Sequence, residues 1–518
     1  MRTTLRVVLA ITFGLTAHAQ HGQHGPSPTR FRPWSGFGGN AQHTALSPVR
    51  SQSFQQIRWQ TPVDLQVQYV AGELVIHYGS PLVTAGNTVI IPVKTGADGG
   101  FRVEAHAARD GALKWSASTD YVLPPHNWIL EFGTVLARGN RLYYPGAGGT
   151  VYYRDCPDAA SGLQGQIAFY GISNYNASHA AYDNAVMINT PITADESGNL
   201  YFGFVVTGET PLGLAGGIAR IGADGAGTWV SAAQAASDSS IAQVVHNCAP
   251  AVSADGQTIY VAVNDPDNAG YLLALNAATL ATVSRVRLKD PATLDDATLL
   301  NDGTASPMVG WDGEVYYGVL ESADENHDRG WLLHFDAALK QSKTPGAFGW
   351  DDTPSLVPSS MVPSYTGSST YLLMTKFNNY IEDGGDGYNR VAVLDPNDSE
   401  ADPITGVTVM REVLTIADAT PDGSPPAVKE WCINSAAVDP QGHSVIVNNE
   451  DGHLYRWDLI TNAFTETLAL TGGVPEAYTP TVIGPDGTVY AINNGSLYAI
   501  GDAEDRSQNI HTEPGRNR

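Results

Sequence analysis

The chain has 518 residues, of which 42% are hydrophobic and only 16% are charged, with 54 Gly, 31 Pro and 23 Tyr. This composition is typical of a turn-rich β protein and excludes intrinsic disorder or a coiled coil for most of the chain. The formal net charge is -25 at pH 7. Because an acidic surface repels phosphate backbones, we exclude nucleic acid as a partner.

The N-terminus has the pattern of an export signal. A basic start, an apolar run over residues 7–15 and small residues at positions 17 and 19 predict a signal peptide over residues 1–19. This run is too short to cross a bilayer, and no later stretch reaches the roughly 18 apolar residues of a membrane span. We therefore expect a secreted or periplasmic protein, monomeric and without a membrane span.

Two polar segments flank the expected folded region. Residues 20–33 are predicted to form a flexible leader, and residues 503–518 a polar C-terminal tail. The cysteines are Cys156, Cys248 and Cys432, so at least one thiol is unpaired even if export permits a disulfide. Their spacing does not decide between one disulfide bridge and three unpaired thiols.

Residues 80–490 contain a repeated pattern. Each unit has a small residue, often followed by Pro, then a short apolar strand, a Gly-containing turn and a Tyr- or Val-rich strand. Gly permits the positive φ of a tight hairpin turn, and Pro is tolerated at the start of a strand. The eight units begin at Ser80, Gly133, Thr190, Ala249, Ser306, Thr353, Ser435 and Thr479, with turns at Gly86, Gly139, Gly198, Gly256, Gly313, Gly367, Gly442 and Gly487.

The repeat predicts an all-β fold, an eight-bladed β-propeller. A third strand follows in several units, as in 271–276, 331–336 and 391–395, and residues 113–115 and 228–230 suggest a fourth. Four-stranded units repeating around an axis are propeller blades. The last unit supplies only three strands, so residues 55–60 are expected to complete its sheet and close the ring. Seven blades remain the alternative if one unit is an insertion, and the 133–189 unit is the least regular.

A family resemblance supports this fold. The segment Trp34-Ser35-Gly36-Phe37-Gly38-Gly39-Asn40, which leads to Ser47-Pro48, resembles the start of bacterial PQQ-like repeat propellers, the quinoprotein superfamily. The similarity covers roughly residues 34–502 and includes the Asp-Gly turns and a Trp on the fourth strand. The resemblance implies the fold. It does not imply one activity, because the superfamily includes PQQ-dependent dehydrogenases, an outer-membrane assembly lipoprotein and proteins without an assigned reaction.

The sequence departs from the dehydrogenases of that superfamily. Their adjacent cysteine pair beside the quinone has no counterpart, and there is no Cys-x-x-Cys-His motif for a c-type haem. We therefore carry over no catalytic residue. PQQ and Ca²⁺ stay open as cofactors, and neither has a complete motif.

The candidate site is the face of the propeller at the channel mouth, where the loops between consecutive blades meet. These loops contain His, acidic, amide and aromatic residues that could bind a polar ring-bearing ligand or perform acid/base chemistry. The same residues are also typical of a solvated loop surface. The catalytic candidates are His77, Tyr78, His126 and His246, and the ligand-binding candidates are Trp128, Glu131, Asp302, Asp352, Lys376 and Trp431; Asp183, Asn247, Asp351, Glu430, Asn434, Glu476 and Tyr478 lie in the same loops.

Residues 383–389 offer oxygen ligands for a hard cation, with Asp383 and Asp386 as the metal candidates. The twelve-residue calcium loop is incomplete, so an ordinary turn is the competing interpretation. Lys376 is expected either to pair with an anionic ligand group or to bridge Glu382 and Asp383.

Two functions follow, and the sequence does not decide whether the protein is an enzyme. The first is an exported propeller that binds a small molecule, a polysaccharide or a protein at the channel-mouth face. The second is an enzyme with its site at the channel mouth, either a PQQ-dependent oxidoreductase or a carbohydrate-active lyase or hydrolase.

Overall fold

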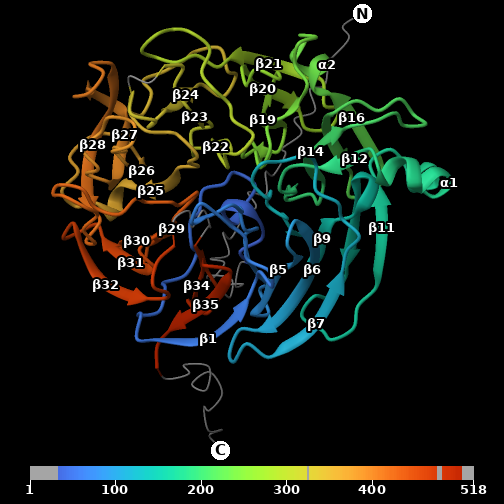
Figure 1. Cartoon of the computed structure of the whole chain (residues 1–518), viewed down its shortest axis with the longest axis horizontal. Helices are drawn as coiled ribbons and strands as arrows, with labels where there is room; N and C mark the ends of the chain where they lie inside the picture. Colours follow the sequence, from blue (N-terminus) through green and yellow to red (C-terminus); the bar gives the residue numbers. More distant parts are fainter. Residues whose placement is uncertain (1–32, 324–325, 475–480, 504–518) are drawn as a thin grey trace, which may run out of the picture.

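A computed structural model describes residues 33–323, 326–474 and 481–503. Within these residues, eight antiparallel sheets are arranged around a central axis, and a two-stranded hairpin forms a ninth sheet (Figure 1). The chain is an eight-bladed β-propeller, as the repeat predicts, and the seven-bladed alternative is wrong. The predicted signal peptide, almost all of the leader and tail, and Glu476 and Tyr478 lie outside the described residues.

The first four blades follow one another along the chain, each with its first strands nearest the axis. In the third and fourth blades the inner strand is split into two short pieces that pair with the same neighbour. Their strands are β4 (Leu82–Val83), β5 (Thr88–Gly96), β6 (Gly99–Ala107), β7 (Leu113–Ser118); β8 (Val135–Ala137), β9 (Arg141–Pro145), β10 (Thr150–Arg154), β11 (Gln164–Ala168); β12 (Val186–Ile188), β13 (Thr193–Ala194), β14 (Leu200–Val206), β15 (Gly217–Ile221), β16 (Gly227–Ser231); and β17 (Gln243–Val244), β18 (Ala251–Val252), β19 (Thr258–Asn264), β20 (Gly270–Asn276), β21 (Thr282–Arg287).

The last four blades include two variants of the repeat. The described part of the fifth blade has three strands, and the eighth takes its outer strand from the N-terminal part of the chain. Their strands are β22 (Met308–Val309), β23 (Val315–Val319), β24 (Trp331–Phe335); β25 (Ser355–Pro358), β26 (Tyr371–Phe377), β27 (Arg390–Ala401), β28 (Thr408–Ala417); β29 (Ala437–Asp439), β30 (Ser444–Asn448), β31 (His453–Asp458), β32 (Ala463–Ala469); and β33 (Val482–Ile483), β34 (Val489–Asn493), β35 (Ser496–Gly501), β1 (Gln56–Pro62).

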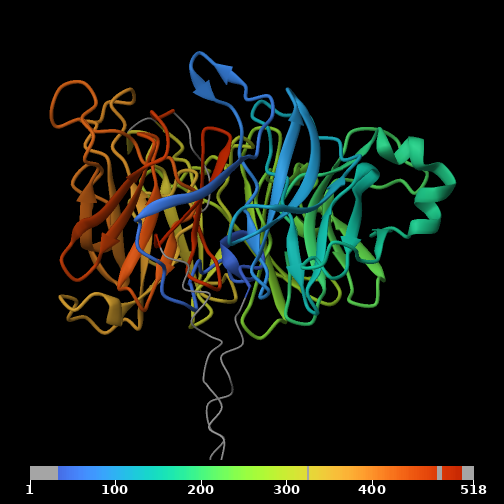
Figure 2. The ribbon, with the colours of Figure 1, turned by 90° about the horizontal axis from the view of Figure 1, so that it is seen from below.

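Few elements lie outside the blades. The hairpin of β2 (Tyr69–Val70) and β3 (Glu73–Leu74) projects from one face of the ring (Figure 2). The helices are α1 (Ile172–Asp183) and α2 (Ala232–Ala236), with short 3-10 turns η1 (Phe37–Gly39), η2 (Ala147–Gly149) and η4 (Ser359–Met361). None of the described helices has the length and apolar character that crossing a membrane requires.

The burial of a strand follows its position in the blade. Middle strands such as β34 are buried along their whole length, because neighbouring blades cover both faces. Outer strands such as β32 alternate between half-buried and exposed residues. This alternation is the period of a strand with one solvated face.

Turn glycines behave as predicted in five of the eight units. Gly139, Gly198, Gly256, Gly313 and Gly487 have φ between 70° and 90°. In the first and seventh blades the left-handed residue is instead the one after the glycine, Asn87 (φ 60°) and His443 (φ 50°). Gly367 is not left-handed either, because η4 and a longer loop connect β25 to β26.

The outer strands are joined to the next blade by tryptophan side chains. Trp59 of β1 donates its indole N–H to the Ala108 carbonyl of the first blade at 2.7 Å. Trp115 of β7 donates in the same way to the Pro157 carbonyl of the second blade at 2.7 Å. Because β1 pairs with β35, the Trp59 contact ties the eighth blade to the first.

The N-terminal segment from residue 34 to 47 runs inside the ring (Figure 1). Its backbone hydrogen-bonds with the inner strands of six blades, and the buried imidazole Nδ1 of His43 lies 2.7 Å from the Pro307 carbonyl oxygen. The backbone partners are Val83, Leu136, Val252, Val309, Leu356 and Val438. A single segment therefore holds most of the blades together at their inner edges.

None of the three cysteines forms a disulfide. Cys156 is exposed, and Cys248 and Cys432 are buried.

Candidate functional site

The loops that precede the blades meet on the face that carries hairpin β2–β3, which we call the channel-mouth face. His77, at the start of the first blade, is 1% exposed. Its Nε2 lies 2.6 Å from the carbonyl oxygen of Asp302, in the loop before the fifth blade. Its ring stacks on the half-buried Trp128 indole, with 5.2 Å between ring centres and 22° between the planes. The His77–Asp302 contact thus crosses the mouth between opposite sides of the ring.

Asp302 lies near two of the predicted histidines, His77 and His246. Its carboxylate accepts a hydrogen bond at 3.1 Å from the amide of Asn127, which is exposed. Burial lowers the pKa of His246 to about 4, and the charge of Asp302 opposes this shift while the nearby His126 adds to it. Burial also lowers the pKa of His77, opposed by Asp351 and Asp302. His77 and His246 are therefore mainly neutral imidazoles at pH 7.

Glu131 is a buried acid in the mouth with an unsatisfied oxygen. The side chain is 4% exposed, and its Oε1 has no hydrogen-bond partner among the described residues. Burial, reinforced by the charge of Asp351, raises the pKa of Glu131 to about 8. The group is therefore mainly a neutral carboxylic acid at pH 7. A buried polar atom without a partner typically costs about 1–3 kcal/mol, which makes Glu131 a functional-site candidate.

Two consecutive aspartates before the sixth blade complete the mouth. Asp351 has a left-handed backbone (φ 54°), and its carboxylate accepts a hydrogen bond from the Thr304 hydroxyl at 2.6 Å. Asp352 accepts from the Thr375 hydroxyl at 2.6 Å, and burial raises its pKa to about 7, opposed by the charge of Lys376. Lys376 is itself fully buried, with its Nζ 5.8 Å from the centre of the Phe348 ring.

Tyr78 and Trp431, two of the predicted site residues, make contacts that belong to the packing of the fold. The Tyr78 hydroxyl donates to Asp64 at 3.0 Å, and Asp64 forms a buried ion pair with Lys94, also at 3.0 Å. This group fixes the base of hairpin β2–β3. Trp431 is fully buried, packed against Tyr455 and Phe464 of the seventh blade.

The metal candidates Asp383 and Asp386 lie in an exposed loop after β26. Asp386 accepts hydrogen bonds from the Asn379 amide at 2.6 Å and the Tyr388 N–H at 3.0 Å, as in an ordinary Asx-type turn. In the part of the chain that the structure describes, neither residue belongs to a group of three potential metal ligands. A metal in this loop stays a prediction.

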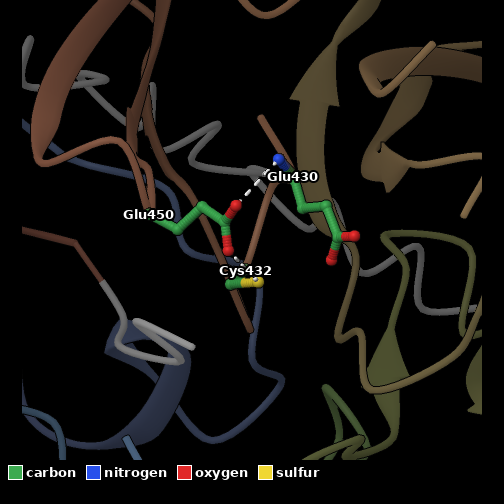
Figure 3. A group of neighbouring side chains, drawn as sticks. All are labelled: Glu430, Cys432 and Glu450. Atoms are coloured by element: carbon green, nitrogen blue, oxygen red, sulfur yellow. Dashed lines mark hydrogen bonds between the residues drawn. The ribbon is translucent and has the colours of Figure 1, made fainter. Parts of the chain in front are cut away.

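A second acidic cluster lies between the sixth and seventh blades on the same face. Glu430, Cys432 and Glu450 each offer a ligand atom, and these atoms lie within 4.8 Å of one another. The Glu450 carboxylate already accepts from the Glu430 N–H at 3.2 Å and from the Cys432 thiol at 3.5 Å, while the Glu430 carboxylate points away from both (Figure 3). As it stands, this is a hydrogen-bonded cluster centred on Glu450.

Sequence reasoning placed Glu430 on this face but missed Cys432 and Glu450. The available signal was the Glu-x-Cys spacing, which puts both side chains on one side of an extended segment. Glu450 could not be foreseen, because it comes from the turn between β30 and β31.

Comparison with known proteins identifies the class of this propeller. Two similar solved structures are a europium-containing methanol dehydrogenase, with a TM-score of 0.55, 11% identity and coverage of 89% of each chain, and the quinohemoprotein alcohol dehydrogenase from Comamonas testosteroni, with a TM-score of 0.55, 11% identity and coverage of 94% of this chain and 82% of that one. BamB from Moraxella catarrhalis aligns at a TM-score of 0.44, with 12% identity and coverage of 88% and 99%.

No family model matches the sequence, and neither does any curated protein. At these identities the structural similarity establishes the fold alone. The chain has the PQQ-like eight-bladed propeller fold, which confirms the resemblance carried by the N-terminal segment and the Asp-Gly turns.

The fold raises the question of whether the mouth fits PQQ, a flat quinone with several carboxylates. Such a group needs a planar slot and cationic partners. Here the His77 ring lies against the Trp128 indole. The same loops carry the four acids Glu131, Asp302, Asp351 and Asp352, and the charge of the buried Lys376 already acts on Asp352. The residues present do not fit the quinone.

Proposed function

We propose that this protein is a binding propeller that recognises a neutral, hydroxyl-rich ligand of the carbohydrate class at its channel mouth, without a quinone. The observation that carries the proposal is the buried Glu131 acid with an unsatisfied Oε1. Kept neutral by burial, this group accepts a hydrogen bond at one oxygen and donates one through the other. A hydroxyl group both donates and accepts, so it matches Glu131 better than a charged group does.

The surroundings of Glu131 favour the same class of ligand. The Asn127 amide and the Asp302 carboxylate form a hydrogen-bonded pair at the accessible edge of the mouth, beside the half-buried Trp128 ring. Amide and carboxylate groups next to an aromatic ring bind polar, ring-shaped ligands. An anionic ligand would face the Asp302, Asp351 and Asp352 carboxyl groups, which makes it a poor partner.

We extend the proposal to the compartment. The predicted signal peptide over residues 1–19 would export the protein to the periplasm or beyond the cell, where polysaccharides are accessible. Fractionation of cells that produce the full chain tests this: the mature protein should start at Gln20 in the exported fraction. Recovery of uncleaved protein in the cytoplasm would contradict it.

Thermal shift and calorimetric titration test the ligand class. The ligands are neutral cello-, malto- and chito-oligosaccharides, and PQQ with and without Ca²⁺. We expect a saturable rise in melting temperature with one neutral series and none with PQQ, because only a ligand of the native state stabilises it. Saturable stabilisation by PQQ would overturn the proposal.

Variants locate the site. Glu131→Leu removes both hydrogen-bonding oxygens. Asp302→Asn removes the negative charge of the Asn127–Asp302 pair and keeps its shape. We expect Glu131→Leu to weaken binding at least about tenfold, the loss of roughly one strong hydrogen bond. The matched control is Asp383→Asn, in the exposed loop after β26, which should leave the affinity unchanged.

The carbohydrate-active enzyme is a second candidate, favoured by one observation. Glu131 and Asp352 have pKa values of about 8 and 7, in the range of a general acid working near neutral pH. Incubation with the bound oligosaccharide, followed by a reducing-end assay, distinguishes the two. Turnover that Glu131→Gln lowers at least about a hundredfold identifies a catalytic acid, and absence of turnover with retained binding identifies a binding protein.

A further inference from the structure

One cavity lies away from the channel mouth, at the outer side of the ring. It has a volume of about 190 Å³ and opens between the outer strand β21 of the fourth blade and β24 of the fifth. An apolar protein cavity of about 150 Å³ is already large enough to hold benzene. The cavity can therefore hold a ligand the size of one substituted aromatic ring.

The cavity exists because the fifth blade lacks a regular fourth strand. The segment after β24 returns along that strand but pairs only at isolated points, Phe335 with Ser342 and Leu332 with Gly346. Pro345 has no N–H to continue the ladder, and its carbonyl accepts instead from the Met410 N–H of the sixth blade at 2.7 Å. The segment is thereby drawn away from β24, and the space beside the strand stays open.

The walls of the cavity are largely apolar. Leu333 and Phe335 line it from β24, and Pro345 from the returning segment. Leu294 lines the opposite side, where it is 73% exposed and has a left-handed backbone, φ 65°. Its loop is fixed, because Leu294 N–H donates to the Asp290 carbonyl at 2.9 Å and the Asp290 carboxylate accepts from the Ser322 N–H at 2.8 Å. A rigid loop thus holds an exposed leucine at the cavity.

The cavity is also rich in cations. Arg287, Lys289 and Lys343 are three of its eleven lining residues, against 28 Lys and Arg in 518 residues overall. Arg287 and Lys289 share one acidic partner, Asp296, at 2.8 Å and 2.7 Å, and Asp265 lies 3.7 Å from Arg287.

Lys343 contacts Glu314, which His334 also contacts at 2.6 Å. A lysine ammonium has three donors, so Lys289 and Lys343 keep N–H groups beyond those directed at their acidic partners. An acid with an apolar body would find both donors and walls here.

We propose that this cavity binds a small aromatic monocarboxylate. The ring lies against Leu294, Leu333 and Phe335, and the carboxylate receives hydrogen bonds from Lys289 and Lys343. The site is independent of the channel mouth, because it is formed by the outer strands of two blades.

The test uses phenylacetate, its neutral amide phenylacetamide and the cation phenethylamine, titrated against the mature protein by saturation-transfer NMR and calorimetry. A ligand of this size that fits well is expected to have a Kd on the order of 1 mM. Phenylacetate should bind at least about tenfold more tightly than phenylacetamide, the usual gain of a charge-assisted hydrogen bond. Equal affinity for the acid and the amide, or no saturable binding of phenylacetate, would overturn the proposal.

Two variants place the ligand. Ser342→Trp fills the cavity from an exposed position and should abolish binding. Lys289→Met removes one donor, while Asp296 keeps its ion pair with Arg287. This variant should weaken phenylacetate binding about five- to tenfold without affecting phenylacetamide binding. Lys340→Met, at an exposed position of the same returning segment that does not line the cavity, is the matched control and should change nothing. If folded Ser342→Trp binds phenylacetate as well as the wild type does, this cavity is not the site. If Ser342→Trp does not fold, the same result with Lys289→Met excludes the cavity.

Discussion

The imidazole Nε2 of His77 lies 2.6 Å from the carbonyl oxygen of Asp302, although 225 positions separate them in the sequence. The two residues precede the first and the fifth of eight blades, so this contact crosses the ring from one side to the other. It is a direct contact across the channel mouth. The architecture of the mouth therefore depends on a few long-range contacts.

We predict that His77→Ala lowers the free energy of unfolding by about 2–4 kcal/mol. The substitution removes the hydrogen bond to Asp302 and leaves a cavity beside Trp128. Urea unfolding measures the change. His126→Ala is the control, because this half-buried imidazole has its hydrogen bond within its own loop, to the Pro124 carbonyl at 2.6 Å, and the substitution should cost less than about 1 kcal/mol. Equal losses in the two variants would contradict a cross-channel role.

Glu131 should make the protein less stable as the pH rises from about 4.5 to 8. Its pKa is about 8 in the folded state, against 4.5 for an ordinary glutamate side chain, so between these values only the folded state keeps the proton. Stability therefore falls with rising pH across this window, by about 1.4 kcal/mol per unit of pKa difference at most, and is constant above it.

We expect Glu131→Gln to be more stable than the wild type above pH 8 by a few kcal/mol, and close to it at pH 4. Denaturant unfolding at several pH values measures this. Asp383→Gln, in an exposed loop, should follow the wild-type profile. A Glu131→Gln profile parallel to that of the wild type would show that Glu131 is ionised in the folded protein.

His43 should contribute the opposite dependence at lower pH. Burial lowers the pKa of this imidazole from 6.5 to about 4, so protonation favours the unfolded state. Stability is retained above pH 6.5 and falls as the pH drops toward 4. His43→Gln should lose stability at pH 7 but show a flatter profile between pH 6.5 and 4. His179→Gln, whose side chain is 66% exposed, should match the wild type, and an unchanged slope in His43→Gln would refute the assignment.

The junction of the eighth and first blades should be sensitive to one added methyl group. A Cβ at Gly111 would lie 2.7 Å from the Trp59 indole, and Gly111 has φ 71°. Gly111→Ala should therefore cost more than about 2 kcal/mol, through the clash and the backbone strain together. Gly406→Ala is the matched control, since its φ is 74° and no atom lies within 4 Å of the added Cβ.

The backbone strain alone should cost about 1 kcal/mol at Gly406. Thermal or urea unfolding of both variants measures the difference. If the two glycines tolerate alanine equally, Trp59 does not pack as tightly as the structure indicates.

Much of the fold could be predicted because each blade carries its own local signals. The strand that starts with Ser306-Pro307 and turns at Asp312-Gly313 became β22 and β23, with Gly313 at φ 84°. Local signals failed where the blade departs from the repeat. Gly367 suggested a tight turn, but η4 lies between β25 and β26. The predicted third strand at Trp331 did not indicate that the fifth blade lacks a regular fourth strand among the described residues.

The candidate site was predictable in position but not in detail. The loops ahead of the blades could be named because the repeat fixes where each first strand begins, and two of the candidate histidines, His77 and His246, lie near Asp302. Tyr78 follows His77 directly in the sequence, yet its hydroxyl turns to Asp64 below hairpin β2–β3. Adjacent residues of an extended segment point in opposite directions, so sequence proximity could not decide which of them faces the mouth.

The sequence by itself determined the all-β repeat, the number of units and the acidic character, because periodicity and composition are local properties. The tertiary structure alone decided that the segment from residue 34 to 47 binds six inner strands, that Glu131 lacks a partner for Oε1, and that Pro345 leaves a cavity beside β24. Each of these depends on contacts between residues far apart in the chain. Burial and hydrogen-bond satisfaction arise only when the ring brings such segments together, so no local pattern can report them.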